Sequence, residues 1–254
     1  MIESETYTVN LKLETLNLKQ KIMKDLFGQA ILDFQTNNSP EDLQTETSIS
    51  EADEMPAAYL FRAFDQMPLL EQTALELAKG KTLDVGCGAG SHSLYLQDKG
   101  LEVTAIDISA KAIAACQLRG LKHARVQHVL AIQNETFDTI LLLMNGTGIF
   151  RTLEELPTYL QKLQSLLNPN GQILIDSSDL IYMYDENEDG SYSIPAEGYY
   201  GELTFTMSYK GQTEEPFPWL YLDYNTLQRA AQAHGFQCDL LVEGDHYDYL
   251  ARLS

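Results

Sequence analysis

Basic residues, cysteine and long apolar runs are all scarce in this sequence. Its 254 residues include 17 Lys and Arg against 37 Asp and Glu, which gives a formal net charge of −20. Such a charge repels phosphate backbones and anionic lipids, so nucleic acid and membrane are disfavoured as partners. The longest apolar stretch, 139–144, has the length of a strand and is too short to span a bilayer.

The three cysteines, Cys87, Cys116 and Cys238, are widely spaced and odd in number. This usage fits buried thiols in a reducing compartment better than a disulfide framework or a metal site. Residues 1–5 are acidic and lack the basic and then apolar layout of a secretory signal. We therefore expect a cytoplasmic protein without a bound metal. The sequence carries no signal for an oligomeric state.

The most informative segment is 83–90, which reads Leu-Asp-Val-Gly-Cys-Gly-Ala-Gly. An apolar strand ends here in three glycines at alternate positions, Gly86, Gly88 and Gly90, and a helix follows. Glycine allows a sharp turn and leaves room for a ligand against the backbone. A second apolar strand ends in Asp107, and an acid at that point of a doubly wound sheet can hold a ribose diol. Together these features predict a nucleoside-binding site.

The spacing of the glycines separates the kinds of nucleoside site. A dinucleotide site requires Gly-x-Gly-x-x-Gly and a phosphate loop requires Gly-Lys-Ser/Thr, and neither is present. The segment instead resembles motif I of the class I S-adenosylmethionine-dependent methyltransferases, Asp-x-Gly-x-Gly-x-Gly. Asp84 matches the first position of that motif, and Asp107 falls where the family has its ribose-binding acid.

The resemblance implies a set of cofactor contacts. The backbone of the glycine loop, Cys87 included, would approach the methionine and ribose, and Ile108 would line the adenine. Asp84 would sit near the cofactor's amino group, or would only tie the glycine loop together. Asp107 would hold both ribose hydroxyls, or would be a surface acid before a helix. We expect the Cys87 thiol to pack and not to act as a nucleophile.

Two further positions are compared with the family. After the third strand the family often has an acid that meets the adenine amino group, but here the stretch is Gln127-His128-Val129-Leu130. His128 could replace the acid by accepting a hydrogen bond, or could face solvent. After the fourth strand, Met144 and Asn145 fall where the family meets the methionine moiety and the substrate. The absence of proline and an aromatic residue after Asn145 argues against methylation of DNA bases or glutamine amides.

The order of elements predicts the fold. From residue 81 strands and helices alternate at the spacing of a parallel sheet, and the last two strands, 236–243 and 246–253, form a hairpin. We expect an α/β protein with a Rossmann-like, doubly wound, seven-stranded sheet, a C-terminal antiparallel hairpin and an antiparallel insert after the fifth strand. Residues 1–55 would form an N-terminal helical extension and an acidic loop, and 56–254 the methyltransferase domain, with the insert at 178–220 as a substrate cap.

The segments that flank the sheet suggest how a pocket is covered. Residues 36–56 and 178–220 are both expected over the carboxyl ends of the strands, with 41–55 as a mobile lid. Tyr182, Tyr184 and Trp219 are candidates for the wall of a pocket for a cationic or apolar small molecule, whereas alternation places Tyr199, Phe205 and Tyr209 in the core of the insert. His92 is a candidate general base.

These observations predict an S-adenosylmethionine-dependent methyltransferase that acts on a small-molecule substrate. Methyl transfer from a sulfonium needs placement of the nucleophile and exclusion of water, so the cofactor site is easier to recognise than a catalytic group. Two alternatives remain at this point. The chain could bind S-adenosylmethionine without transferring a methyl group, or it could be an oxidoreductase with a nucleotide cofactor.

Overall fold

The computed structural model describes residues 24–254, so the first 23 residues of the predicted helical extension lie outside the described residues. Its main sheet has the strand order β11-β12-β7-β6-β3-β4-β5. The five strands from β7 to β5 are parallel, and β12 is antiparallel to both of its neighbours. This confirms the predicted fold class. The strands are β3 (Thr82–Val85), β4 (Val103–Asp107), β5 (Ala124–Val126), β6 (Phe137–Leu142), β7 (Leu167–Ser178), β11 (Cys238–Glu243) and β12 (Asp248–Leu253).

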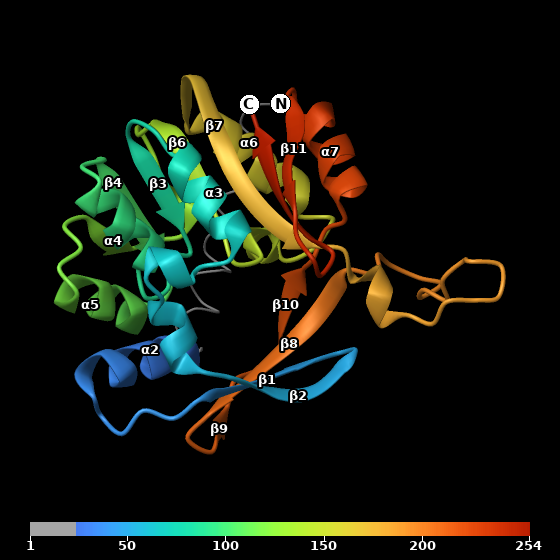
Figure 1. Ribbon diagram of the computed structural model, residues 1–254, viewed down its shortest axis with the longest axis horizontal. Coiled ribbons are helices and arrows are strands. Elements are labelled where there is room, and N and C mark those ends of the chain that lie inside the picture. Colours follow the sequence, from blue (N-terminus) through green and yellow to red (C-terminus); the bar gives the residue numbers. More distant parts are fainter. Residues whose placement is uncertain (1–23) are drawn as a thin grey trace.

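Helices cover both faces of this sheet (Figure 1). They are α3 (Leu69–Leu77), α4 (Ser91–Asp98), α5 (Ala110–Leu118), α6 (Leu156–Ser165) and α7 (Tyr224–Ala233). Short 3-10 turns connect several elements: η1 (Ala57–Phe61), η2 (Phe64–Gln66), η3 (Val129–Ala131), η4 (Gly146–Phe150) and η5 (Leu180–Met183). Between residues 24 and 254, none of the helices has the length and apolarity of a membrane span.

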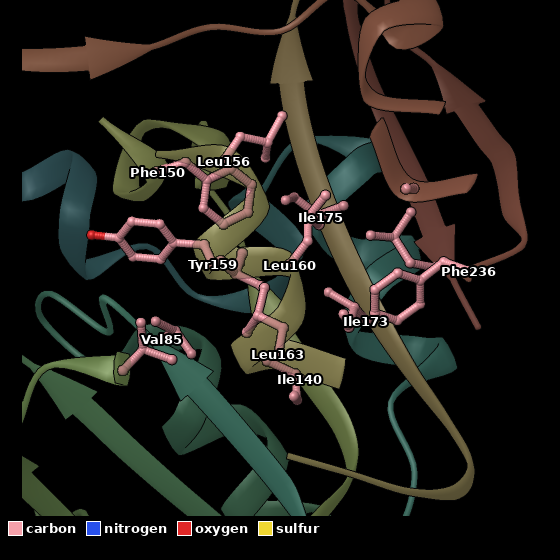
Figure 2. Packing of buried hydrophobic residues seen from close by; sticks show 14 of the residues in the cluster. Val85, Ile140, Phe150, Leu156, Tyr159, Leu160, Leu163, Ile173, Ile175 and Phe236 are labelled. Carbon is pink, nitrogen blue, oxygen red and sulfur yellow. The ribbon is translucent and has the colours of Figure 1, made fainter. Parts of the chain in front are cut away.

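The central strand β6 is buried on both faces, as its continuous apolar run predicts. Ile140 and Leu142 pack in the cluster that includes α6 and α7, while Leu141 packs in the cluster under α3. Figure 2 shows Tyr159 and Leu160 of α6 in the first of these clusters. Because helices cover both faces of the sheet, a ligand can reach it at the edge formed by the carboxyl ends of the strands.

A second, antiparallel sheet lies beyond the carboxyl ends of the parallel strands (Figure 1). Its strand order is β10-β8-β1-β2, with β9 paired to β8, and we call it the cap sheet. β10 packs against η4, the turn that follows β6, so the cap sheet contacts the main sheet at this edge. Its strands are β1 (Leu43–Thr47), β2 (Ser50–Met55), β8 (Glu202–Tyr209), β9 (Gln212–Thr213) and β10 (Phe217–Leu220).

The expectation of an acidic loop at 41–55 was wrong, because this segment forms β1 and β2. β1 pairs on one side with β2 and on the other with β8, so it lies inside the cap sheet. Leu43 is fully buried, but every other side chain of the two strands is partly or fully exposed, which removes the apolar alternation that marks a strand. The acids on β2 keep this edge from pairing with further strands.

Helix α2 (Leu26–Thr36) joins the cap sheet to the main sheet. It packs against α5 and β8. Its buried Asp33 accepts hydrogen bonds from the hydroxyl of Tyr209 (3.1 Å) and from Nζ of Lys210 (2.7 Å), both at the end of β8. Between residues 24 and 55 the N-terminal extension is thus helical in α2 alone, and this helix is tied to the insert.

Candidate functional site

The glycine loop between β3 and α4 turns sharply. Gly86, Gly88 and Gly90 have φ values of 75°, 52° and 79°, a conformation that side chains rarely adopt. A Cβ atom on Gly90 would lie 2.9 Å from Sγ of Cys116, whereas the atom nearest to a Cβ on Gly88 is Cε1 of Phe27 at 3.9 Å. Gly90 is therefore required by close packing, and Gly88 leaves open space beside the backbone.

Asp107 ends β4 and points at this loop. Its Oδ2 accepts a hydrogen bond from N of Gly88 (3.0 Å), and its Oδ1 accepts one from N of Ser109 (2.8 Å). Burial raises the pKa of Asp107 to about 6, against these hydrogen bonds. Each carboxylate oxygen keeps a lone pair for a ligand hydroxyl. Asp107 thus lies beside the glycine loop and is not an isolated surface acid.

Asp84 lies behind the same loop, with an exposed fraction of 2%. Its Oδ2 accepts a hydrogen bond from Oγ of Ser93 in α4 at 2.6 Å, and burial raises its pKa. This geometry favours the interpretation in which Asp84 ties the glycine loop to the following helix.

The Cys87 thiol is buried under the loop, 3.9 Å from the Cys116 thiol. The contact with Cys116 and burial raise the pKa of Cys87 well above its usual value, so this thiol stays protonated. Its packing against α5 agrees with the predicted structural role.

The predicted adenine side contains three residues in different settings. Ile108 is 41% exposed next to Asp107, whereas Val129 is buried in the core. Nδ1 of His128 accepts a hydrogen bond from N of Leu130 (3.2 Å), and burial, with a smaller contribution from Arg151, lowers the pKa of His128 to about 4. The neutral ring therefore carries its proton on Nε2. Nδ1 is thus occupied as an acceptor, and at Nε2 His128 is a donor to any ligand.

The segment after β6 has an unusual backbone. Met144 and Asn145 are successive non-glycine residues with φ values of 64° and 59°, which costs roughly 1–2 kcal/mol for each. Asp176, near the end of β7, holds this conformation because its carboxylate accepts hydrogen bonds from N of Met144 (2.9 Å) and N of Gly146 (2.8 Å). Burial raises the pKa of Asp176 to about 7. Its only sequence signal is an acid at the carboxyl end of an apolar strand.

A buried ionic network lies next to this segment. Glu71 of α3 accepts a hydrogen bond from Nη2 of Arg62 (2.5 Å), and its other oxygen lies 2.6 Å from Nε2 of His92. Burial lowers the pKa of His92, but the hydrogen bond to Glu71 and the nearby Asp84 and Asp176 together raise it above its usual value. His92 is thus engaged by Glu71, and sequence reasoning gave no sign of this partner.

A cavity of about 260 Å³ opens where these groups meet. Its lining combines the ends of β6 and β7 with η1 and the start of α3, and it includes Tyr59, Glu71, Asn145, Asp176, Ser177 and Asp248. Asp248 also lines a second cavity of about 570 Å³. The two cavities are therefore neighbours at the carboxyl end of β7.

The aromatic candidates of the insert have three different positions. The Trp219 ring packs on Gly148 of η4, where a Cβ would lie 2.0 Å from the indole. The Tyr184 hydroxyl donates to a backbone carbonyl, and Tyr182 is 48% exposed and stacks on Tyr247, which lines the larger cavity. Of the three, Trp219 is the one in contact with the segment after β6.

Comparison with known proteins connects this geometry to a family. Residues 83–175 match the family model of the methyltransferase domain. A SAM-dependent methyltransferase from Bacteroides fragilis, solved in complex with S-adenosyl-L-homocysteine, is 49% identical, with 91% of this chain and 94% of that chain covered and a TM-score of 0.84. The chain belongs to the S-adenosylmethionine-dependent methyltransferases. Its cofactor is accordingly S-adenosylmethionine, which decides against the oxidoreductase alternative.

More distant relatives of the methyltransferase differ in their acceptors. The ubiquinone biosynthesis O-methyltransferase of Xanthomonas euvesicatoria is 33% identical over 116 residues, 41% of this chain and 46% of that protein. The glycine/sarcosine N-methyltransferase of Halorhodospira halochloris is 27% identical over 122 residues, 44% and 45% of the two chains. The methyltransferase thus spans less than half the length of these curated relatives. The CcbJ methyltransferase of Streptomyces caelestis, 16% identical with a TM-score of 0.57 over 75% of this chain and 93% of that chain, shares the fold.

The residues of the methyltransferase fit its cofactor. Gly88 offers open backbone, Asp107 offers carboxylate lone pairs beside it, and one amide atom of Asn145 is buried without a hydrogen-bond partner. The structure brings the predicted residues together in two groups. The glycine loop contacts Asp107, and the segment with Met144 and Asn145 contacts Asp176. Val129 is instead buried in the core. Glu71 and Asp176 are the polar groups that sequence reasoning missed.

Proposed function

We propose that the methyltransferase transfers the methyl group to a small-molecule acceptor bound in the 260 Å³ cavity. The observation that carries this proposal is the position of that cavity. It is lined by Met144 and Asn145, whose strained backbone Asp176 holds, at the carboxyl ends of the central strands. Open α/β sheets bind their ligands at this edge.

The proposed cofactor contacts follow from the same geometry. Asp107 would accept hydrogen bonds from the ribose hydroxyls, and the backbone at Gly86, Gly88 and Gly90 would lie against the ribose and methionine. Ile108 and Nε2 of His128 would face the adenine, with His128 as donor. Asp84 would act through the loop that it holds.

Charge and cavity size support a small acceptor. The chain has a formal net charge of −20, which opposes binding of a nucleic acid. A cavity of about 260 Å³ suits a small molecule better than a polymer. We also propose that the cap sheet forms the outer wall of this site, and that the reaction takes place in the cytoplasm. The free, buried state of all three cysteines supports a reducing compartment.

Binding and transfer are tested separately. S-adenosylhomocysteine should raise the melting temperature of the methyltransferase and NAD should not. S-adenosylmethionine with a tritiated methyl group is then incubated with the enzyme and a cell extract that is split by size. Label should appear in the low-mass fraction. Label confined to protein or nucleic acid would contradict the proposal, and binding without any transfer would favour a protein that only binds the cofactor.

A further inference from the structure

The amide group of Asn145 is held by hydroxyl groups whose protons can be counted. Oγ1 of Thr147 lies 2.9 Å from the carbonyl oxygen of Leu220 and 2.6 Å from Oγ of Ser177. Oγ of Ser177 accepts a hydrogen bond from N of Leu222 and lies 3.0 Å from one amide atom of Asn145, which we call the inner atom. The other amide atom of Asn145, which we call the outer atom, is buried and has no hydrogen-bond partner.

Each hydroxyl has a single proton, and this decides the orientation of the amide. A carbonyl oxygen can only accept, so Thr147 must donate to Leu220. The contact of 2.6 Å must then use the proton of Ser177, donated to Thr147. No proton of Ser177 remains for Asn145, so the inner amide atom must itself be the donor, Nδ2. The structure has Oδ1 in this inner position, and the proton count selects the reverse orientation, which has the same shape.

The orientation fixes the chemistry of the unpartnered atom. With Nδ2 on Ser177, the outer atom of Asn145 is Oδ1, a buried acceptor that requires a donor. The opposite orientation would leave the 2.9 Å contact between two oxygens, Thr147 Oγ1 and Leu220 O, without a proton. Asn145 lines the cavity, and no described residue supplies a donor for this atom, which makes an N–H or O–H group of a bound ligand the candidate donor.

The charge of the cavities selects among such donors. Glu71, Asp176 and Asp248 line the smaller cavity, and Asp179, Asp223, Glu243 and Asp245 line the larger one beside it. Among the described residues that line either cavity there is no Lys, Arg or His. Glu71 is neutralised by Arg62 and faces His92, but Asp176 contacts only backbone N–H groups and keeps lone pairs for a ligand. These surroundings favour a cation.

We propose that the acceptor is a protonated primary or secondary amine, which donates a hydrogen bond to Oδ1 of Asn145 and gives one proton to the carboxylate of Asp176. This rests on the proposed methyl transfer. Loss of the proton exposes the nitrogen lone pair, and the nitrogen–carbon bond to the methyl group forms as the carbon–sulfur bond breaks. The bonding pair stays on sulfur, which becomes a neutral thioether. The methylated ammonium leaves, and the proton passes from Asp176 to solvent.

The experiment uses the full chain saturated with S-adenosylhomocysteine and three probes of one skeleton: phenethylamine, 2-phenylethanol and phenylacetate. Calorimetry should show the amine binding roughly 10- to 100-fold more tightly than the alcohol, because its hydrogen bonds carry charge, and no binding of the carboxylate. The inference is overturned if the amine binds no more tightly than the alcohol, or if neither of the two binds. If S-adenosylhomocysteine itself does not bind, the proposed function fails instead.

Variants separate the contact with Asn145 from the effect of net charge. Asn145→Leu should reduce the preference for the amine over the alcohol roughly tenfold. Asp98→Asn removes an exposed carboxylate at the end of α4 and should leave the preference unchanged. A crystal structure of the wild-type complex with phenethylamine gives an independent readout should Asn145→Leu not fold. In that complex the nitrogen of phenethylamine must lie within hydrogen-bond distance of the outer amide atom of Asn145 and of the carboxylate of Asp176. Any other position of the nitrogen refutes the proposal.

Discussion

Replacement of Asp107 by Asn should separate ligand binding from stability. The substitution keeps the size of the side chain and removes its charge. The pKa of Asp107 is about 6 in the folded protein against 3.8 for the free side chain. A rise of about two units corresponds to about 3 kcal/mol, so at neutral pH the ionised carboxylate weakens folding by up to that amount relative to its protonated form.

The sign of the pH dependence follows from this shift. The folded protein holds the Asp107 proton more tightly than the unfolded chain, so this group stabilises the fold below pH 3.8 and the effect is lost as the pH rises to about 6. Asp107→Asn has no such dependence. We expect the free variant at neutral pH to melt no lower than the wild type, because loss of one of the two backbone hydrogen bonds is offset by removal of the buried charge.

Binding should change in the opposite direction. Loss of charge-assisted hydrogen bonds to the ribose should weaken the affinity for S-adenosylhomocysteine roughly 10- to 100-fold. Calorimetry gives the affinity, and thermal melting between about pH 4 and 8 gives the stability of both proteins. An unchanged dissociation constant would remove Asp107 from the site. A variant that melts far below the wild type at neutral pH would refute the argument from the buried charge.

Three further substitutions or conditions have defined outcomes. Gly88→Val should abolish binding of S-adenosylhomocysteine, because the side chain fills the open space beside the backbone, and calorimetry tests this. It should also lower the stability by about 1–2 kcal/mol, because φ is 52° at this position, and thermal melting tests that. Tyr159→Phe removes a buried hydroxyl without a partner and should not lower the melting temperature, whereas the control Tyr249→Phe loses a 2.9 Å hydrogen bond and should cost about 1 kcal/mol. The rate of methyl transfer should fall as the pH drops through about 7, where Asp176 becomes protonated and can no longer take a proton; initial rates that are independent of pH would count against its role.

The main sheet could be predicted because its signals are local. Most strands of the parallel part contain a short apolar run, and the glycine loop with Asp107 is encoded within 25 residues of sequence. The pattern of each element shows which of its side chains are buried, although the core that they share is built from distant parts of the chain, so the pattern and the structure agree. The same local pattern is why the family could be recognised at all.

The rest of the site could not be predicted because it depends on distant contacts. β1 and β2 lack apolar alternation, and their partner β8 lies far along the chain. Glu71 and Asp176 are single acids with no motif around them, and only the fold shows that they meet. The tautomer of His128 could not be predicted for a related reason, since the backbone N–H of Leu130 that fixes it belongs to the turn η3.

The pairing of β1 with β8 also constrains the order of folding. Tyr209 at the end of β8 donates to Asp33 across a separation of 176 residues. α2 can pack against α5 and β1 can pair with β2 earlier, but their contacts with β8 form only after residue 209 has been made. Closing so long a loop is slow, whereas the parallel strands meet neighbours nearby in sequence. During synthesis the five parallel strands, which all precede β8 in the chain, should therefore pair before β1 meets β8. Until then Leu43 lacks its contact with Tyr209, and the cap sheet, the proposed outer wall of the site, should become ordered after the parallel strands.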